Sequence, residues 1–250
     1  MGPVKDLTRT VVFLAGLRGD RRREIQVRVV NNKGKKFRVP DATILRLPLY
    51  LDKLILLQQA GVKEVSSRQL ATSLDIKASQ LRHDFHYFGG FSKPGRPYQV
   101  DKLVPALEEI IGVDIPVPMI IVGAGHLGQG LANYRNFERL GFPLRGIFDV
   151  DPKLVGLEIR GVPIRPLSEM PGFVKEHGIK VGVLTVPVNV AQDVANQMIA
   201  AGVVGVWNFT PTDIRTPPQV IVRNERLAVG LMCLSFKTKR IGQNDELRQD

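Results

Sequence analysis

The sequence predicts an α/β protein in two parts, a small helical domain followed by a larger domain built on an open parallel sheet. Three observations support this prediction. Between residues 39 and 114 the apolar residues recur with helical spacing, in the order helix, helix, tight turn, helix. Between residues 115 and 226 short apolar strands alternate with helical segments. A glycine-rich stretch, GAGHLG at 123–128, joins the first of these strands to the helix that follows it.

The composition is typical of a globular protein in a reducing compartment. The 250 residues are 44% hydrophobic, which is enough to bury a substantial core. No run of about 18 apolar residues is present, so no membrane span is expected. The segment VVFLAG, followed closely by RGDRRR, is a poor match to a signal peptide. The single cysteine, Cys233, excludes an intrachain disulfide, and we therefore expect a cytoplasmic protein.

The positive charge is concentrated at the N-terminus. The net charge is +11, but residues 1–38 hold eleven Lys/Arg against three Asp/Glu, whereas residues 39–114 hold nine of each. A binding site for a polyanion in the folded domains is therefore expected to be a local patch. Residues 1–38 are predicted to form a loosely ordered basic extension, and a two-stranded ribbon around Asn31–Gly34 is the alternative.

The segment after this extension has the outline of a helix-turn-helix domain. A leucine-rich run from Leu45 to Gln58 predicts the first helix, with Gly61 as its C-cap. Ser66 or Ser67 caps a short second helix, and a third helix begins near Ala78. Helix, helix, turn and helix in this order predict a DNA-binding fold.

The third predicted helix has one face suited to a core and one suited to DNA. At 100° per residue, Leu81, Phe85 and Phe88 share the core face. The opposite face and its flanks carry the predicted DNA contacts, which are Ser79, Gln80, Arg82, His83 and His86. Hydroxyl, amide, imidazole and guanidinium groups can meet both base edges and phosphates in a major groove. An ordinary solvated helix face is the alternative.

A glycine- and proline-rich segment follows this helix. Gly89 and Gly90 end the helix, and residues 91–98 then resemble the wing of a winged helix, with Lys93 and Arg96 directed at phosphates or the minor groove. An ordinary surface loop is the alternative. The predicted DNA-binding set is completed by Arg46 on the first helix.

A second domain follows the helix at 100–112, with the boundary expected at 113–118. Its expected strands are MIIV (119–122), RGIF (145–148), KVGVLTV (180–186), VVGVWNF (203–209) and QVIV (219–222). Because helices separate these strands, they predict a doubly wound parallel sheet of the Rossmann type, covered on both faces. The domain is expected to end at residue 226, and a C-terminal helix and tail to occupy 227–250.

The glycine-rich stretch predicts a dinucleotide site. Gly123, Gly125 and Gly128 give the spacing GxGxxG directly after an apolar strand, and Asp149 ends the next strand, 21 residues after Gly128. Here Gly123 permits the turn, Gly125 lets the backbone approach a pyrophosphate, and Gly128 lets the helix pack on the sheet. Asp149 would repel a 2′-phosphate, which favours NAD(H) over NADP(H). The predicted loop also includes Ala124, His126 and Leu127. A tight strand–helix turn without a ligand is the alternative.

Two later strands end in small polar residues and proline. Further cofactor contacts are therefore predicted at Thr185, Val186 and Pro187, and at Asn208, Phe209 and Thr210. The reason is that open α/β sheets bind ligands at the carboxyl ends of their strands. The alternative is that both motifs only punctuate loops.

The histidine positions favour binding without turnover. A nicotinamide dehydrogenase usually needs a general acid or base beside the hydride acceptor. The histidines lie at 83, 86, 126 and 177, and none falls naturally in a substrate pocket. No catalytic residue and no metal site is therefore predicted. The alternatives are a small NAD-dependent oxidoreductase with a helical dimerisation domain, and a subunit resembling the CoA-binding domain of acyl-CoA ligases. Neither alternative needs a DNA-binding face.

The order of these motifs resembles one known family. The segments LRLPLYLDKL, VSSRQLATSL, LRHDFHYFGGFSKPGRPY, VGAGHLGQGLANY, FDVDPKLVG and NFTP are similar to those of the redox-sensing transcriptional repressor Rex, over residues 39–237. The resemblance implies a homodimer of winged-helix and Rossmann-type domains, whose C-terminal helix crosses to the partner. It also implies that the dimer binds a palindromic double-stranded operator and releases it when NADH replaces NAD⁺. The glycine loop and Asp149 match the family's cofactor loop, and Arg82 and the wing cations match its DNA side.

The DNA-binding segment departs from the family pattern in two places. The third helix carries His83 where a second basic residue is expected and His86 where a serine is expected. The wing carries Ser92 and Pro97 where the family usually has glycines, and Pro94 where it has a basic residue.

A further departure concerns two charges. The family tends to carry a basic residue on the first helix and an acidic one just before the C-terminal helix, and these pair across the dimer in one redox state. Here the two positions hold Asp52 and Arg226, so the signs are exchanged. We therefore hypothesise that the pair is kept with reversed polarity.

Overall fold

The computed structural model describes residues 11–14, 26–30, 36–89, 91 and 95–246. The chain divides into two compact units, residues 1–116 and residues 117–250.

The first unit begins with a small antiparallel sheet. Its strands are β1 (Val11–Leu14), β2 (Gln26–Val30) and β3 (Lys36–Arg38), in the order β1-β2-β3. A loosely ordered extension was the favoured prediction for residues 1–38, whereas these described segments pair as strands. Antiparallel pairing gives hydrogen-bond partners to the backbone groups of segments whose apolar residues alternate. The predicted turn at Asn31–Gly34 lies outside the described residues.

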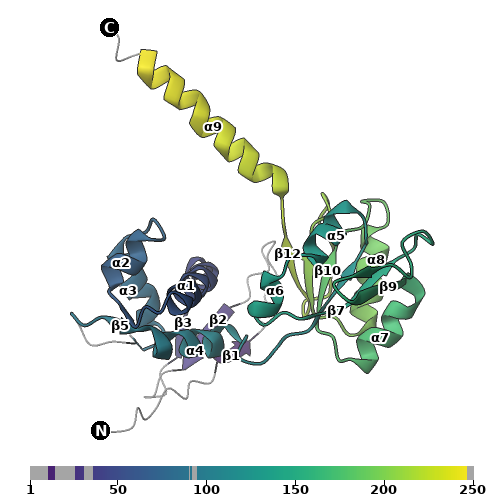
Figure 1. The fold of residues 1–250 in the computed structure, drawn as a ribbon, viewed down its shortest axis with the longest axis horizontal. Coiled ribbons are helices and arrows are strands. Elements are labelled where there is room, and N and C mark those ends of the chain that lie inside the picture. Colours follow the sequence, from purple (N-terminus) through teal and green to yellow (C-terminus); the bar gives the residue numbers. More distant parts are fainter. Residues whose placement is uncertain (1–10, 15–25, 31–35, 90, 92–94, 247–250) are drawn as a thin grey trace. The chain divides into compact units, whose positions relative to one another are not determined.

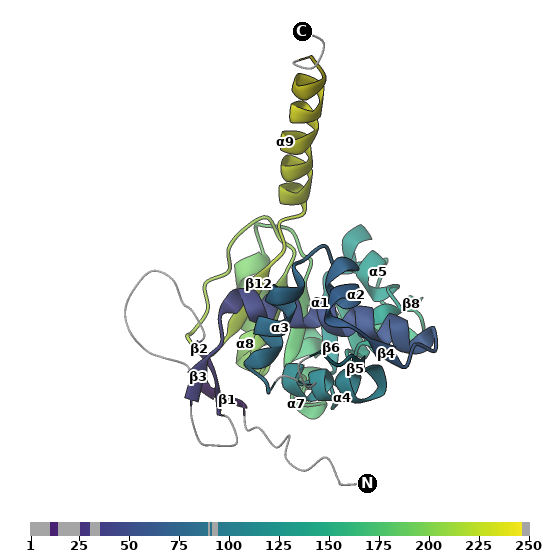
Figure 2. The same cartoon turned by 90° about the vertical axis from the view of Figure 1, so that its left-hand side faces the viewer.

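Four helices follow in the described part of this unit, and Figure 2 shows them gathered together. They are α1 (Asp41–Gln59), α2 (Ser67–Thr72), α3 (Ala78–His86) and α4 (Val100–Ile111). The short strands β4 (Glu64–Val65) and β5 (Tyr98–Gln99) pair antiparallel between them. The helix-turn-helix order predicted from the sequence is therefore confirmed.

Local chemistry sets the ends of these helices. The Ser66 hydroxyl accepts a hydrogen bond from the Gln69 amide at 3.1 Å, and the Gln69 side chain accepts one from the Ser66 amide at 2.9 Å, so the two residues form a capping box at α2. Gly61 (φ +76°) follows α1 and Gly112 (φ +81°) ends α4 in the left-handed conformation that glycine adopts most easily.

Phe85 lies at the centre of the core of the first unit. Its ring is fully buried and makes edge-to-face contacts with Tyr50, Phe91 and Tyr98, with centroid distances of 5.5, 5.0 and 5.3 Å. The three residues predicted to form the core face of α3, Leu81, Phe85 and Phe88, are at most 2% exposed. These aromatic contacts hold α3 against the rest of the unit.

A seven-stranded sheet organises the second unit. Its strands are β6 (Met119–Val122), β7 (Leu144–Asp149), β8 (Glu158–Ile159), β9 (Val162–Pro166), β10 (Val181–Leu184), β11 (Gly205–Asn208) and β12 (Ile221–Asn224). The order is β12-β11-β10-β6-β7-β9-β8, parallel throughout except that β8 is antiparallel to β9. The predicted parallel sheet is confirmed, although β12 begins two residues later than predicted. A turn in which the Val220 amide bonds to the Pro217 carbonyl delays the pairing.

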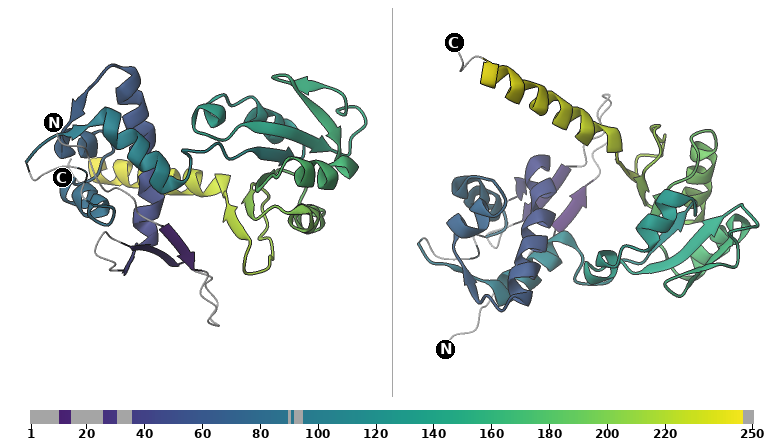
Figure 3. Two further views of the ribbon diagram at one scale, coloured as in Figure 1. Left: turned by 90° about the horizontal axis from the view of Figure 1, so that it is seen from below. Right: turned by 45° about the horizontal axis from the view of Figure 1, so that its top comes forward.

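Helices cover both faces of this sheet, as Figures 1 and 3 show. One face packs against α7 (Met170–Glu176) and α8 (Ala191–Ala201), and the other against α5 (His126–Ala132), with α6 (Asn136–Arg139) beside it. A short 3₁₀ turn, Leu167–Glu169, precedes α7. The chain builds outward from β6 on one side and returns through β10 on the other. The carboxyl ends of β6 and β10 therefore form the switch point at which such sheets bind ligands.

Helix α9 (Leu227–Glu246) follows β12 as one long element (Figure 1). Its large apolar side chains are 50–70% exposed in the single chain: Leu227, Val229, Leu231, Met232, Leu234 and Phe236. The predicted C-terminal helix is thus present, and residues 247–250 lie outside the described part. Within the described ranges, no helix combines the length and the hydropathy that a membrane span requires.

Candidate cofactor site and candidate DNA-binding face

The glycine-rich loop runs tightly against the end of β10. Gly123 follows β6 directly and has φ +101°, a conformation that side chains rarely adopt. A Cβ atom at Gly123 would lie 2.8 Å from the carbonyl carbon and oxygen of Thr185. The first glycine is therefore required both by its backbone conformation and by the neighbouring strand.

The other two glycines have opposite surroundings. A Cβ atom at Gly128 would lie 1.9 Å from the carbonyl oxygen of Gly123, so only glycine lets α5 pack this closely on the loop. A Cβ atom at Gly125 would meet no atom within 4 Å. Gly125 thus leaves open space at the start of α5, where backbone N–H groups favour an anion. His126 and Leu127, also predicted in this loop, are exposed beside it. These surroundings fit a dinucleotide pyrophosphate.

The Thr185 hydroxyl fastens the two central strands together. Its Oγ1 lies 2.7 Å from the carbonyl oxygen of Gly123 and 3.0 Å from that of Val122. Thr185 therefore supports the glycine loop across the switch point. Val186 is half-buried and Pro187 is exposed just beyond it.

Asp149 lies at the end of β7, next to the glycine loop. Its carboxylate accepts hydrogen bonds from the backbone amides of Ala124 and, at 2.9 Å, Asp151. The structure thus brings together the loop and the acidic residue that the sequence predicted to act on one ligand. A carboxylate at this point fits the hydroxyl groups of an unphosphorylated ribose.

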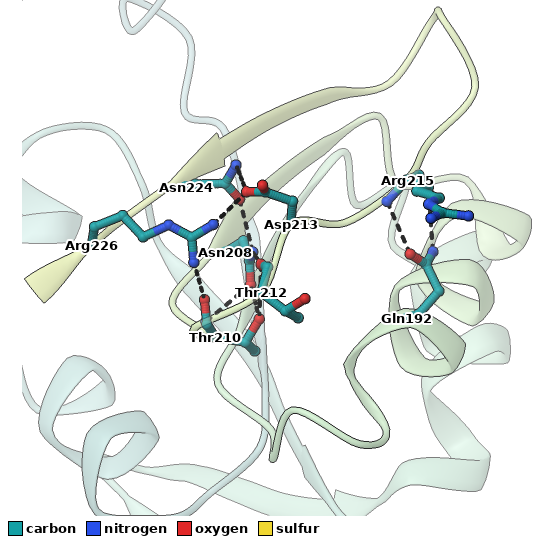
Figure 4. A network of polar contacts seen from close by, with 8 residues as sticks. All are labelled: Gln192, Asn208, Thr210, Thr212, Asp213, Arg215, Asn224 and Arg226. Atoms are coloured by element: carbon teal, nitrogen blue, oxygen red, sulfur yellow. Dashed lines mark hydrogen bonds and ion pairs between the residues drawn. The ribbon is translucent and has the colours of Figure 1, made fainter.

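The predicted cofactor residues at the end of β11 are more deeply buried than those of the glycine-rich loop. Asn208 is fully buried and Thr210 is 2% exposed. The Asn208 carboxamide donates to the Thr212 carbonyl (2.7 Å) and to Asn224 (2.8 Å), and it accepts from the amide and hydroxyl of Thr210 (Figure 4). These two side chains shape the loop from within, while Phe209 is half-buried and packs on Trp207 with centroids 4.7 Å apart.

The exposed face of α3 carries most of the predicted DNA contacts. Exposed side chains on α3 and in the segment that follows it are Ser79, Arg82, His83, His86 and Arg96. Arg82 Nη1 donates to the Ser67 hydroxyl at 3.2 Å, which joins the first residue of α2 to α3. The Tyr87 hydroxyl lies 3.2 Å from Nε2 of His83. Lys93, predicted on the wing, lies outside the described residues, as do Gly90, Ser92 and Pro94.

Asp84 is the residue of this domain that the sequence analysis missed. It is fully buried on α3 and accepts hydrogen bonds from Thr43 (2.9 Å), Tyr50 (2.6 Å), Arg46 (2.7 and 2.8 Å) and Gln80 (3.0 Å). Burial alone would raise the pKa of this carboxyl group, but the donated hydrogen bonds outweigh it and lower the pKa. The carboxylate is therefore a charged hub that joins α1 to α3.

Two residues predicted to contact DNA belong to this network. Arg46 directs Nε and Nη2 at Asp84, and Gln80 directs its amide nitrogen at the same carboxylate. The hydrogen bond to Asp84 raises the pKa of Arg46, and burial followed by the hydrogen bond to Asp84 raises that of Tyr50. Both Arg46 and Gln80 therefore support α3. The helical spacing of Thr43, Arg46 and Tyr50, on one turn after another of α1, is the signal that could have revealed the network.

The two charges predicted to pair across a dimer lie in different units. Asp52 is exposed on α1. Arg226 forms an ion pair with Asp213 in its own chain, and its Nη1 donates to the Thr210 carbonyl at 3.3 Å (Figure 4). Over the described residues, no cluster of His, Cys, Asp or Glu could hold a metal ion.

Comparison with known proteins gives matches for both units. The family described as "Putative DNA-binding protein N-terminus" matches residues 38–85, and the "CoA binding domain" family matches residues 114–212. The chain is 44% identical over 203 residues to the "Redox-sensing transcriptional repressor Rex" of Caldicellulosiruptor saccharolyticus, covering 81% of this chain and 93% of the relative. It is 39% identical over 198 residues to the Rex of Clostridioides difficile, covering 79% and 94%.

Solved structures give the same result. The Rex-family repressor RSP superimposes with a TM-score of 0.75 at 38% identity, covering 84% of this chain and 98% of RSP. RSP has also been solved with β-NAD⁺ and operator DNA (TM-score 0.75, 39% identity, 85% and 98% covered) and with β-NADH (TM-score 0.75, 38% identity, 84% and 98% covered).

Proposed function

The chain belongs to the Rex family of redox-sensing transcriptional repressors, and we propose that it binds operator DNA through α3 and releases it when NADH occupies the glycine-rich loop. One observation supports this proposal above the others. A single chain carries a polar, basic helix face on a helix-turn-helix unit and, separately, a GxGxxG loop hydrogen-bonded to Asp149. The presence of both a DNA-binding face and a nucleotide-binding loop in one chain is explained if the bound nucleotide controls DNA binding.

The DNA contacts that we propose fall into two groups. Ser79, Arg82, His83, His86, Lys93 and Arg96 would meet the operator. Arg46 and Gln80 would act indirectly, because Asp84 already takes their hydrogen bonds. Since a two-fold symmetric protein matches a two-fold symmetric site, the operator is palindromic. A repressor of this kind works in the cytoplasm, on the genome.

We also propose a homodimer held by α9. Its exposed apolar residues recur at 227, 231 and 234, a helical spacing that a second copy of the chain can cover.

The cofactor site supports binding without turnover. The Thr185 hydroxyl is committed to the carbonyl groups of Gly123 and Val122, and the Asn208 and Thr210 side chains are committed to one another. These groups hold the loop in shape, so they are poorly placed to move a proton to or from a substrate. The "CoA binding domain" match reflects a shared nucleotide-binding fold, and the helix-turn-helix unit is what separates this chain from an acyl-CoA ligase subunit.

The response to redox state follows from differential binding. NAD⁺ and NADH differ by a hydride and a unit of charge at the nicotinamide. A ligand shifts a conformational equilibrium only by the difference in its affinity for the two states. NADH must therefore stabilise a dimer in which the two α3 helices no longer match half-sites about one turn apart.

We further propose that Asp52 of one subunit pairs with Arg226 of the other in one of these states. The single variants Asp52→Arg and Arg226→Asp place like charges together, whereas the double variant restores an attractive pair. Release of DNA by NADH, measured for all three variants, tests the pair. A double variant that performs no better than either single variant would show that the two residues are uncoupled.

A mobility-shift assay tests the function itself. The full chain is incubated with palindromic DNA, selected from a random pool, at several salt concentrations with and without NADH. We expect affinity to fall steeply with salt, and we expect NADH to dissociate the complex. Turnover of NADH with a carbonyl substrate, without a DNA complex, would favour the oxidoreductase instead.

A further inference from the structure

Residues 225 and 226 join β12 to α9, and together with Asn224 at the end of β12 they are tied to the loop after β11. The Glu225 amide donates to the Asn208 carbonyl at 2.8 Å, and Asn208 Nδ2 donates to Asn224 Oδ1 at 2.8 Å. The start of α9 is thereby fixed to the strand whose end carries Phe209 and Thr210.

Two charged side chains strengthen this connection. Asp213, in the loop after β11, pairs with Arg226 and accepts from Asn224 Nδ2 at 3.1 Å (Figure 4). Arg226 also donates to the Thr210 carbonyl at 3.3 Å. An exposed ion pair alone contributes little, and the Asp213 side chain is 80% exposed. The added bonds to a carbonyl and to Asn224 make this a network that fixes geometry.

Glu225 forms the second connection. Trp207 Nε1 donates to Glu225 Oε1 at 3.1 Å, and Arg223 Nε donates to the same oxygen at 3.1 Å. Trp207 also packs on Phe209, so its indole ring connects the loop after β11 to Glu225. Glu225 and Asp213 thus both hold the junction between β12 and α9, through different partners.

We propose that Asp213 and Glu225 are positioning residues that transmit the state of the loop after β11 to the first turn of α9. A displacement of residues 208–210 would move Arg226 through Asp213 and Thr210, and would move Glu225 through Trp207. The direction of α9 sets how two subunits meet, so the network couples the cofactor site to the dimer. This inference rests on the proposed function.

The test compares Asp213→Asn and Glu225→Gln with Glu176→Gln, which removes an exposed carboxylate from the end of α7. Two quantities are measured on the full chain. The first is hydrogen exchange at the amides of Glu225 and Val229, which needs no ligand. The second is the ratio of the DNA dissociation constants with and without NADH.

We expect faster exchange in both junction variants and a ratio about two- to thirtyfold closer to one, with neither change in Glu176→Gln. The pair Asp213→Arg with Arg226→Asp restores an attractive pair within the chain, so it should recover the slow exchange at Glu225 and Val229 that Asp213→Arg alone loses. Unchanged hydrogen exchange in the junction variants would show that Asp213 and Glu225 do not hold the junction. Faster exchange with an unchanged ratio of dissociation constants would show that the junction does not couple NADH to DNA binding. If wild-type protein shows no NADH response, the proposed function fails and transmission fails with it, whereas the exchange data still decide whether the junction is held.

Discussion

Arg46 on α1 and Asp84 on α3 form a two-point ion pair, with Nε and Nη2 of the guanidinium 2.7 and 2.8 Å from the two carboxylate oxygens. Asp84 is fully buried, and the Arg46 side chain is 24% exposed. Such a fork fixes both distance and angle. The pair therefore sets how α3, the helix that carries the proposed DNA contacts, is held against α1.

Removal of the Asp84 charge should destabilise the DNA-binding unit. In Asp84→Ala, Arg46 loses its buried partner, and Tyr50 and Thr43 lose an acceptor. Breaking a buried pair of this kind costs about 3–5 kcal/mol. Urea unfolding followed by circular dichroism measures the loss. Glu109→Gln, on the exposed side of α4, should differ from wild type by less than about 0.5 kcal/mol. An equally small loss of unfolding free energy in Asp84→Ala would show that the Asp84 network does not stabilise the DNA-binding unit.

The same carboxylate predicts an acid-sensitive stability. Hydrogen bonds lower the pKa of Asp84 in the folded state despite its burial. Its contribution is therefore complete above the unfolded-state pKa of about 3.9 and is lost as pH falls through the lower folded-state value. The stability difference between wild type and Asp84→Asn should stay constant near neutrality and shrink below about pH 4. A difference that is equal at every pH would mean that folding does not lower the pKa of Asp84.

The glycine loop offers a matched pair of substitutions. A Cβ atom at Gly128 would lie 1.9 Å from a carbonyl oxygen, whereas one at Gly130, in the same helix, meets nothing within 4 Å. Gly128→Ala should weaken NADH binding at least about tenfold, because a shift of the loop misplaces its amides. Gly130→Ala should leave binding intact and stabilise α5 by up to about 1 kcal/mol. Calorimetric titration with NADH checks both. Equal NADH affinities in the two variants would show that the close packing at Gly128 is not needed for cofactor binding.

Asp149 should control the choice between NADH and NADPH. The carboxylate repels the 2′-phosphate of NADPH. Asp149→Ser should therefore weaken NADH binding and reduce the ratio of the NADPH to the NADH dissociation constant. One charged hydrogen bond contributes about 1.5–3 kcal/mol, which corresponds to roughly a tenfold to hundredfold change in affinity. Dissociation constants for both dinucleotides give the ratio. A ratio that does not change in Asp149→Ser would place the ribose elsewhere.

The spacing of apolar residues and the positions of helix-capping residues were sufficient to predict most of the fold. Ser66, Gly61 and Gly112 mark helix ends through local chemistry, and the core face of α3 follows from its helical spacing. The glycine loop and Asp149 could be predicted because their spacing encodes a local strand–turn–helix and the end of the next strand.

The functions of buried polar residues could not be predicted in the same way. Asp84 lies between the exposed His83 and the buried Phe85 in the sequence, and its donors Thr43, Arg46 and Tyr50 come from α1. Asn208 follows the pattern of a ligand contact at a strand end, yet it also donates to Asn224, which lies beside it only once β11 and β12 pair. Such contacts depend on tertiary packing, to which local propensity is blind.

The dissociation constant of palindromic operator DNA, measured by fluorescence anisotropy at one fixed salt concentration, tests the central claim most directly. The full chain is titrated without cofactor, in saturating NAD⁺ and in micromolar NADH. We predict that NADH raises the dissociation constant by about 5–150-fold, the usual range of coupling between two sites, while NAD⁺ leaves it unchanged. Equal dissociation constants in the two redox forms would contradict the assignment of this chain as a redox sensor.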